Sequence, residues 1–476
     1  MKPVLIARKK ECEQLAECLK STRSEFVIIC GRRRIGKTFL VDQFFNGNFD
    51  FTFVGVHKGK TAIQLRNFAK ALKRHSGKEA SPFKDWYDAF DSLEEYLESM
   101  PKDRKKVIFI DEMPWIDTNR SSFVEALENF WNGWANRRYD IVLIASGSAT
   151  SWMADNLIEN QGGLHNRITR RIYLEPFTLG ETEEYFKQRK FYWTRYEMLQ
   201  SYMFTGGVPY YLSLLEPKLS IGQNIDMLFF DENGPLRKEF NELYPALFGH
   251  SESYIKIVSL LYQHKSGLTR KEISQSTNLN GKRLNTILEN LELCDFIDKM
   301  ELFGKESTLV YRLSDFYTLF YYKFIADKHK LDEQWWSHHI DDAGIRSWQG
   351  LCFELVCIKH HRQIKKALGI SGMATSVSTW RCYPDKKNDL SGGQVDMIIE
   401  RADRIIHLCE MKFSQRSYNI TAEYEKKLRE RMWLFDTRTK NKKPLVYTFV
   451  TTFGVGEGKH HSIVHSEVTM DDLFNS

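Results

Sequence analysis

The residues from Gly31 to Thr38 follow the pattern G-x-x-x-x-G-K-T, whose residue types suit the binding of a nucleotide's phosphates. The glycines let the backbone wrap closely around a phosphate group, with its N–H groups pointing inward. Lys37 would reach the β- and γ-phosphates, and the Thr38 hydroxyl would hold Mg²⁺. The sequence therefore predicts a site for ATP and Mg²⁺ formed by eight residues: Gly31, Arg32, Arg33, Arg34, Ile35, Gly36, Lys37 and Thr38.

An acidic pair, Asp111 and Glu112, directly follows the apolar run 107–110. In a nucleotide-hydrolysing site, Asp111 would hold Mg²⁺ through water, and Glu112 would orient and deprotonate the attacking water. The alternative is the solvated end of an ordinary strand. Because the pair comes roughly 70 residues after a phosphate-binding loop, we favour the catalytic interpretation.

Two serines follow the next strand-like run, residues 140–145. A polar side chain at this place can contact the γ-phosphate, so Ser148 is a candidate sensor of the nucleotide and Ser146 is the alternative. An ordinary turn after a strand would have the same composition.

Arg167 precedes another strand-like run, 171–174, and is a candidate for stabilising negative charge in the transition state. It would act within its own chain or across the interface of a homo-oligomer. Arg170 and Arg171 are rival candidates, and an ordinary surface charge is the alternative for all three.

A third set of residues, near the C-terminus, has the types and spacing of a metal-dependent site for cleaving phosphodiesters. Asp396 lies in one strand-like run, and Glu410 and Lys412 share a face of the next, because strand residues two apart point the same way. Asp396 and Glu410 would coordinate Mg²⁺, helped by the Met411 carbonyl, while Lys412 would position the attacking water. This arrangement resembles the D-x(n)-E-x-K set of restriction-endonuclease-like enzymes, and Glu354 resembles their extra acidic ligand.

The E-x-K spacing alone is weak evidence, because it begins at four glutamates: Glu216, Glu410, Glu425 and Glu457. Only Glu410 lies in an apolar strand that follows an Asp-bearing strand, where a charged side chain is costly unless paired or metal-bound. A following helix carries three residues that would contact the scissile backbone: Tyr424, Lys426 and Lys427. The alternative is a degenerate nuclease fold that binds or signals without cleaving.

The elements that must position these residues divide the chain into four predicted regions. Short apolar strands alternate with amphipathic segments in 1–175, which predicts an α/β fold with a parallel sheet covered by helices. Residues 176–249 are mostly helical, with a break at 206–209. Residues 250–325 have a winged-helix pattern, and the α/β pattern returns in 326–476.

The winged-helix prediction rests on two helical stretches and two strand-like runs. Thr269 and Glu272 have the spacing of a capping box, and a second helix follows over 282–294. Lys282 and Arg283 lie early in that helix, where DNA-bound winged helices contact bases or phosphates. The alternative is a protein-docking or spacer module.

Taken together, these motifs resemble the archaeal and bacterial AAA-type ATPases of the STAND class, the signal-transducing NTPases with numerous domains. The resemblance spans essentially the whole chain and rests on the phosphate loop, the acidic pair and four shorter segments: 5–11, 146–148, 174–177 and 206–209. Ala7 departs from the pattern, because relatives commonly have glycine there. The resemblance implies a P-loop ATPase core, a helical lid, a winged helix and a C-terminal PD-(D/E)XK nuclease-like domain.

The composition of the chain indicates its cellular location and the kind of partner that it binds. The chain of 476 residues has no apolar run near the 18 residues that a membrane span needs, no apolar stretch typical of a secretory signal near Met1, and eight cysteines without a C-x-x-C pair. We therefore expect a cytoplasmic protein without a membrane partner. From Arg346 onward there are 21 Lys/Arg against 15 Asp/Glu, which accounts for the net charge of +6 and favours nucleic acid as a partner.

Three functions are compatible with the sequence. One is an ATP-hydrolysing switch coupled to a Mg²⁺-dependent nuclease domain acting on DNA or RNA. Another is a STAND-type signalling or nucleic-acid-binding ATPase whose nuclease-like domain is inactive. The third is a transcription regulator that acts through the winged helix, which would require sequence-selective binding. The complete set of acidic residues and lysine favours the first.

Overall fold

The computed structural model describes residues 5–78, 82–148, 150–153, 156–157, 163–164, 166–248, 250–305, 307–326, 332–385 and 391–475. The chain forms two compact units. The first comprises Met1–Pro176 with Leu247–Gly249, and the second comprises Phe177–Ala246 with His250–Ser476. Within the described residues, no helix combines the length and apolar character needed to cross a bilayer.

The first unit is built on a five-stranded sheet of order β2-β3-β4-β1-β5, in which every pairing is parallel. All residues of its three central strands are buried, as expected for a parallel sheet covered on both faces. This confirms the predicted α/β fold class. The strands are β1 (Glu25–Cys30), β2 (Phe51–Val54), β3 (Lys106–Asp111), β4 (Ile141–Gly147) and β5 (Arg170–Tyr173).

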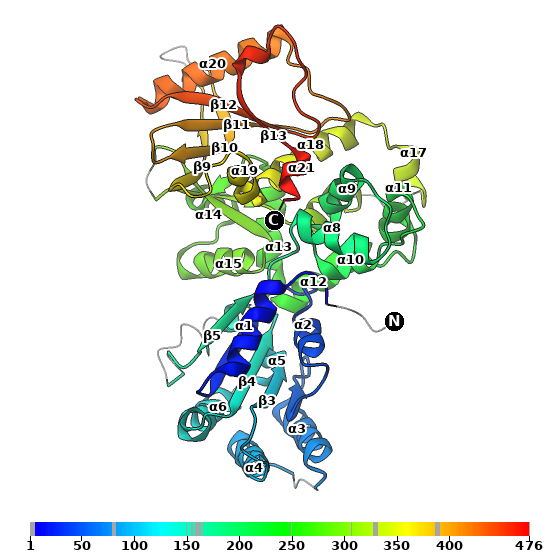
Figure 1. The fold of residues 1–476 in the computed structure, drawn as a ribbon, viewed down its shortest axis with the longest axis vertical. Helices are drawn as coiled ribbons and strands as arrows, with labels where there is room; N and C mark the ends of the chain where they lie inside the picture. The colour runs from blue at the N-terminus through cyan, green and yellow to red at the C-terminus, as the bar shows by residue number, and fades with distance from the viewer. Residues whose placement is uncertain are drawn as a thin grey trace. The chain divides into compact units, whose positions relative to one another are not determined.

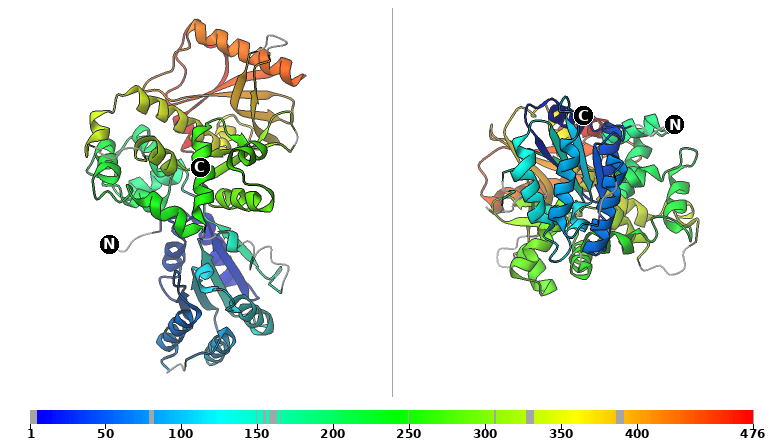
Figure 2. Two further views of the ribbon diagram at one scale, coloured as in Figure 1. Left: turned by 180° about the vertical axis from the view of Figure 1, so that it is seen from behind. Right: turned by 90° about the horizontal axis from the view of Figure 1, so that it is seen from below.

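Helices pack on both faces of this sheet because alternate strand residues point in opposite directions (Figures 1 and 2). Val27 and Ile29 belong to the core that includes α1 and α2, whereas Phe26 and Ile28 belong to the core that includes α3, α4 and α6. The helices of this unit are α1 (Lys9–Lys20), α2 (Lys37–Phe44), α3 (Thr61–Ser76), α4 (Trp86–Glu98), α5 (Met113–Ile116), α6 (Phe123–Asn129), η1 (Phe130–Trp134), η2 (Ala135–Arg137) and α7 (Thr150–Met153).

The second unit begins with helices. Capping boxes at Thr178 and Thr194 begin two of them. The second of these helices ends at Thr205, and Gly206 and Gly207, which follow it, both have positive φ. The helices are α8 (Leu179–Gln188), α9 (Arg195–Thr205), α10 (Pro209–Ser213), α11 (Ile221–Ile225), η4 (Asp226–Phe230) and α12 (Glu239–Leu247).

The described part of the region predicted as a winged helix contains four helices, a β-hairpin and the short strand β6. The Thr269–Glu272 capping box is present, which confirms the predicted start of α14. The elements are α13 (Ser251–Gln263), β6 (Leu268–Thr269), α14 (Arg270–Thr277), α15 (Gly281–Leu293), β7 (Ile297–Leu302), β8 (Leu309–Leu313) and α16 (Phe316–Phe324).

The strands of this region and of the C-terminal region form one mixed sheet of order β13-β12-β11-β10-β9-β7-β8-β6. The join is a short parallel pairing of β7 with β9, which the sequence did not predict. Strands β9–β11 are antiparallel, and β11–β13 are parallel. The C-terminal elements are α17 (Trp335–His338), α18 (Ala343–Lys359), α19 (His361–Ala367), β9 (Thr375–Cys382), β10 (Gly393–Arg401), β11 (Ile406–Lys412), α20 (Ala422–Thr439), β12 (Leu445–Thr451), η5 (His461–Ile463), β13 (Val464–Thr469) and α21 (Met470–Leu473).

A buried ion pair at the amino ends of β3 and β4 provides a test of the first unit's packing. Lys106 Nζ lies 2.6 Å from Asp140 Oδ2, and both side chains are at most 3% exposed. We expect Asp140→Ala to lower the free energy of unfolding by about 3 kcal/mol, because it leaves the Lys106 charge buried without its carboxylate. Chemical denaturation at pH 7 measures this loss, with the exposed Asp103→Ala as control.

The pH dependence of this loss follows from the pKa of Asp140. Burial alone would raise that pKa, but hydrogen bonds from Arg138 and Lys106 lower it from 3.8 to about 2. The stabilisation is therefore complete above pH 3.8 and is lost as the pH falls towards 2. An Asp140→Ala variant as stable as the Asp103→Ala control at pH 7 would contradict this assignment.

Candidate nucleotide site and candidate carboxylate site

The phosphate-binding loop joins the carboxyl end of β1 to the amino end of α2. Gly31 has a φ of 147°, and a Cβ atom there would lie 2.5 Å from the Leu174 carbonyl oxygen, so only glycine fits. Gly36, with a φ of 88°, is the N-cap of α2. The Lys37 ammonium group donates hydrogen bonds to the Gly31 and Arg32 carbonyls, both at 3.1 Å, inside the loop that it would leave to reach a phosphate.

The remaining residues of the loop differ in exposure. Arg32 and Ile35 are buried, Arg33 and Arg34 are half-buried, and Thr38 is exposed at the start of α2. The buried side chains hold the loop against the domain, and a loop held in this way can bind a phosphate through its backbone N–H groups.

Thr38 and Asp111 come together although 73 residues separate them. The Thr38 hydroxyl donates to Asp111 Oδ2 at 2.6 Å, and the Ser146 hydroxyl donates to Asp111 Oδ1. The strand order explains these contacts. Strand β4, which carries Ser146 near its end, lies between β1, which leads to the loop before Thr38, and β3, which ends at Asp111. A hydroxyl and a carboxylate this close are oxygen donors of the kind that Mg²⁺ prefers, so the pair fits the metal.

Glu112 and Ser148 form a second contact at this edge of the sheet. Ser148 Oγ donates to Glu112 Oε1 at 2.5 Å, and its backbone N–H donates to Oε2 at 3.2 Å. The structure therefore places Ser148 on the predicted catalytic glutamate and Ser146 on the predicted metal-binding aspartate. Sequence spacing alone left the two serines as alternatives for one role.

The predicted arginines lie near β5. Arg167 is exposed in the turn before this strand, and Arg171 is also exposed. Arg170 forms an ion pair with Glu17 at 2.9 Å, so this rival candidate is engaged by α1. No contact in the described residues brings Arg167 to the phosphate loop, and its role stays a prediction.

The segment before α1 contacts the residues that follow β5. Ala7 has a φ of 57°, in the left-handed region that favours glycine, and Arg8 follows with a φ of 61°. Arg8 is buried, and its guanidinium donates to the Glu175 carbonyl at 2.8 Å. The departure from glycine at position 7 therefore leaves the turn in place at a conformational cost.

Residues 5–215 match the family model described as an ATPase domain found predominantly in Archaea. The match supports an ATPase domain in this part of the chain. The assignment rests on the family match together with the geometry of the phosphate loop.

Three distant similarities accompany this match. An uncharacterized protein of Methanocaldococcus jannaschii is 24% identical over 328 residues, which cover 68% of this chain and 69% of that protein. The Walker-type ATPase of Pyrococcus abyssi has a TM-score of 0.46 and 16% identity, covering 66% of this chain and 95% of its own. The ORC2 protein of Aeropyrum pernix has a TM-score of 0.43 and 15% identity, covering 75% and 96%.

Outside the ATPase domain, the antiparallel strands β10 and β11 bring the predicted carboxylates together. Asp396 and Glu410 lie one position beyond the paired residues Met397 and Cys409. The register of β10 against β9 shifts between Val395 and Ile398. Such a bulge re-aims the side chains within it and is common beside functional sites.

Glu410 is 7% exposed and is held by three side chains. Arg431 Nη1 lies 2.6 Å from its Oε2, Lys412 Nζ lies 2.8 Å from its Oε1, and the Tyr424 hydroxyl donates to the same oxygen. Burial alone would raise the pKa of Glu410, but the Lys412 and Arg431 charges lower it below its ordinary value. Glu410 is therefore an ionised carboxylate at neutral pH.

Lys412 complements this carboxylate. Burial alone would lower the pKa of Lys412, but Glu410 raises it above its ordinary value. Its ammonium group also lies 4.9 Å from the centre of the Tyr424 ring, a distance typical of a cation–π contact. Lys412 is therefore a charged group that can orient water or phosphate but not a proton acceptor.

Glu354 reaches the same site from α18, which packs against β11. Burial, followed by the nearby Asp396 charge, raises the pKa of Glu354 to about 8. Asp396 is itself 30% exposed, and Gln394 Nε2 donates to it at 2.5 Å. The four residues predicted from the sequence thus lie within electrostatic reach of one another.

The site contains two cations that the sequence analysis missed. Arg431 lies seven residues after Tyr424 on α20, and this helical spacing could have indicated that both side chains share a face. Arg312 comes from β8, with its Nη1 atom 3.7 Å from Asp396 Oδ1. No signal in the sequence pointed to Arg312, because its strand precedes the site by more than 80 residues.

Any Mg²⁺ at this site would have Asp396 and Glu410 as its carboxylate ligands. Among the described residues, no three His, Cys, Asp or Glu side chains come close enough together to hold a metal ion. Mg²⁺ often takes only one or two carboxylates from a protein, with water and substrate phosphates as its other ligands. Asp396 and Glu410 fit that requirement.

The other predicted nucleic-acid contacts lie on surfaces. Lys426 and Lys427 are exposed and pair with glutamates of α20, while Tyr424 is turned to Glu410. Lys282 and Arg283 are exposed at the start of α15.

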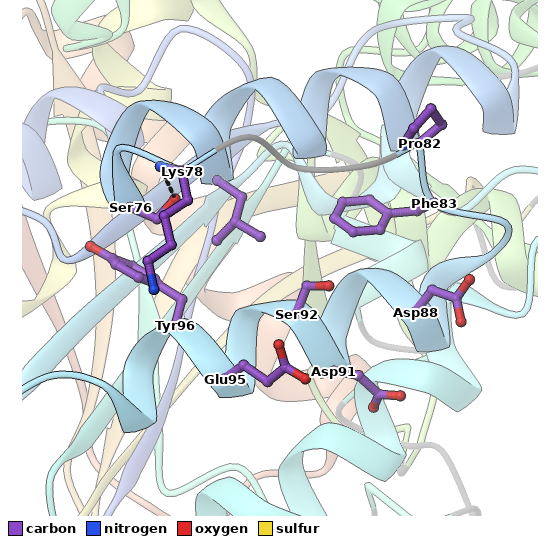
Figure 3. A pocket seen from close by; sticks show the side chains of 10 residues that line it. Ser76, Lys78, Pro82, Phe83, Asp88, Asp91, Ser92, Glu95 and Tyr96 are labelled. Carbon is purple, nitrogen blue, oxygen red and sulfur yellow. Dashed lines mark hydrogen bonds between the residues drawn. The ribbon is translucent and has the colours of Figure 1, made fainter.

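A hollow of about 490 Å³ between α3 and α4 contains none of the predicted site residues (Figure 3). Its lining combines the Phe83 ring and the Lys78 side chain with carboxylates of α4, Asp88, Asp91 and Glu95. The pocket is therefore separate from the chemistry of the phosphate loop.

Replacing Lys37 tests the nucleotide site. We expect Lys37→Ala to reduce ATP turnover at least about 100-fold and to weaken ATP binding, because the phosphates lose their ammonium partner. Turnover and labelled-ATP titration measure the two effects, with the exposed Lys9→Ala as a control on the same domain. Turnover at the wild-type rate would overturn the assignment of the loop.

Replacing Glu112 separates binding from hydrolysis. We expect Glu112→Gln to bind ATP normally while hydrolysing it at least about 100-fold more slowly, because Thr38 and Asp111 remain in place. The same titration and turnover assays apply. Loss of ATP binding would show that Glu112 has a structural role instead.

Proposed function

We propose that the chain is an ATP-binding and ATP-hydrolysing switch coupled to a Mg²⁺-dependent nuclease-like domain that acts on DNA or RNA. The observation that carries the proposal is the convergence of Asp396, Glu410 and Lys412 on adjacent antiparallel strands, with Glu354 nearby. The coupling itself is inferred from the presence of an ATPase domain in the same chain.

On the ATPase side, each residue has a distinct task. Lys37 would leave the loop carbonyls and neutralise the β- and γ-phosphates, while Thr38 and Asp111 would hold Mg²⁺. Glu112 would orient and deprotonate the attacking water, and its contact with Ser148 would have to loosen for this step. Arg167 is the candidate for contacting transition-state charge.

On the nuclease side, Asp396 and Glu410 would hold Mg²⁺, which supplies charge stabilisation for a phosphate under attack. Lys412 would orient the attacking water beside Glu410, since its ammonium group already lies at that carboxylate. Arg431 and Tyr424 would fix the carboxylate in place, so that its geometry does not depend on the substrate.

Binding of nucleic acid would use several surfaces of the second unit. The excess positive charge begins at Arg346, and phosphate contacts made by many cations dominate the affinity of nucleic-acid-binding proteins. We propose that α14, α15 and the β7–β8 hairpin form a winged helix. Lys282 and Arg283 of this module would contact the backbone of the nucleic acid.

A second candidate is a signalling or nucleic-acid-binding ATPase whose nuclease-like domain does not cleave. One observation favours it: both oxygens of Glu410 are engaged by protein groups, and the cations Lys412 and Arg431 balance its charge. A carboxylate satisfied in this way can serve as a structural ion pair.

Cleavage by single-site variants distinguishes these two functions. We expect Asp396→Ala and Lys412→Ala to lower Mg²⁺-dependent cleavage at least about 100-fold while ATP turnover changes less than about twofold, because each centre has its own ligands. Nucleic-acid binding should persist, since one cation among many contributes modestly. Cleavage, binding and turnover are measured on the same preparations.

Lys442→Ala is the matched control, because it removes an exposed lysine of the same region that has no role in the proposed site. Cleavage by Asp396→Ala at the wild-type rate would show that the site is misplaced. Absence of cleavage by the wild type with Mg²⁺ or Mn²⁺ under every nucleotide condition would establish the second candidate instead.

A further inference from the structure

Arg312 is a buried cation that the hairpin β7–β8 contributes to the carboxylate site. The residue is 7% exposed, and its Nη2 atom donates to Thr379 Oγ1 at 2.7 Å. The same hydroxyl donates to the Val395 carbonyl at 3.0 Å, directly beside Asp396. Arg312 Nη1 lies 3.7 Å from Asp396 Oδ1. The guanidinium is thus fixed on one side and aimed at the carboxylate on the other.

The backbone makes this placement rigid. Glu301 and Leu302 of β7 pair in parallel with Ser378 and Thr379 of β9, so the hairpin is an extension of the sheet that carries Asp396. A second link joins β9 to α14, because Arg381 of β9 donates to Glu272 Oε2 at 2.6 Å. The strand that carries Arg312 and the strand that carries Asp396 therefore belong to one continuous sheet.

Cations of the protein face both carboxylates of the site. Lys412 and Arg431 face Glu410, and Arg312 faces Asp396. Burying a carboxylate near others is costly without opposite charge, and a fixed guanidinium supplies that charge permanently. A divalent cation at Asp396 would therefore enter a place where a positive charge already resides.

We propose that Arg312 is a positioning residue of the carboxylate site: it is the resident counter-ion of Asp396 and sets how tightly a divalent cation binds there. This inference rests on the proposed role of Asp396 as a metal ligand. The guanidinium orients Asp396 and repels the incoming cation, so the site binds metal weakly until a phosphodiester adds negative charge. Metal occupancy is thereby tied to the presence of substrate.

Arg312→Gln removes the positive charge of the residue and keeps a polar side chain at this position. Removing one positive charge a few ångströms from a divalent cation strengthens the cation's binding. We expect the Kd for Mn²⁺ at this site to fall about tenfold in Arg312→Gln and to change less than about twofold in Arg312→Lys.

The experiment is a Mn²⁺ titration of the nucleotide-free full chain, followed by the electron paramagnetic resonance signal of free Mn²⁺. Asp396→Asn identifies the site, because it should abolish the Mn²⁺ binding that Arg312→Gln strengthens, alone and in the double variant. Lys299→Gln is the matched control, since it removes a half-exposed cation from the same hairpin and should leave the Kd unchanged. Thermal unfolding verifies that each variant is folded.

If Arg312→Gln does not fold, Thr379→Val provides the test, because it removes only the hydroxyl that anchors the guanidinium. We expect the Kd for Mn²⁺ to fall about threefold in that variant. An unchanged Kd in the folded variant, with Asp396→Asn still abolishing binding, overturns the role of Arg312 and leaves the proposed metal site standing. Mn²⁺ binding that is insensitive to Asp396→Asn overturns both.

Discussion

Asp111 and Glu410 are carboxylates at the carboxyl ends of strands, and both are almost completely removed from water, with exposures of 3% and 7%. An ionised carboxylate in such a place costs free energy unless hydrogen bonds or opposite charges compensate it. The surrounding elements in each unit supply that compensation. The strand order of the parallel sheet and the register of the mixed sheet both bring distant side chains to these two oxygen pairs.

The two units compensate their carboxylates in different ways. Asp111 accepts hydrogen bonds from the hydroxyls of Thr38 and Ser146, which are uncharged donors. Glu410 is held by Lys412 and Arg431, whose charges oppose its own. A cation that approaches Asp111 gains the full attraction of the carboxylate, whereas one that approaches the second site meets resident positive charge. The first arrangement fits the proposed ATP–Mg²⁺ site, and the second fits the metal site whose occupancy we propose to depend on substrate.

The continuous sheet of the second unit changes how its modules are understood. By sequence, the helices and hairpin of 250–325 and the α/β region after 326 look like separate pieces. Strand β7 joins them by pairing with β9, and Arg312 and Arg381 then connect side chains across the join. Helix α15 packs on β7, so α15 and Asp396 are both attached to one continuous sheet.

The sequence by itself determined the features that short stretches encode: the phosphate loop with its flanking strand and helix, the Asp111–Glu112 pair at a strand end, the α14 capping box, and the shared face of Glu410 and Lys412. These depend on spacing within about ten residues, because strand alternation and helix capping are local. Only the tertiary structure decided which serine meets which acidic residue, that Arg431 and Arg312 enter the carboxylate site, and that β7 pairs with β9. Those contacts join residues such as Arg312 and Thr379, 67 positions apart. They follow from packing and from the need to compensate buried charge, neither of which leaves a periodic signal in the chain.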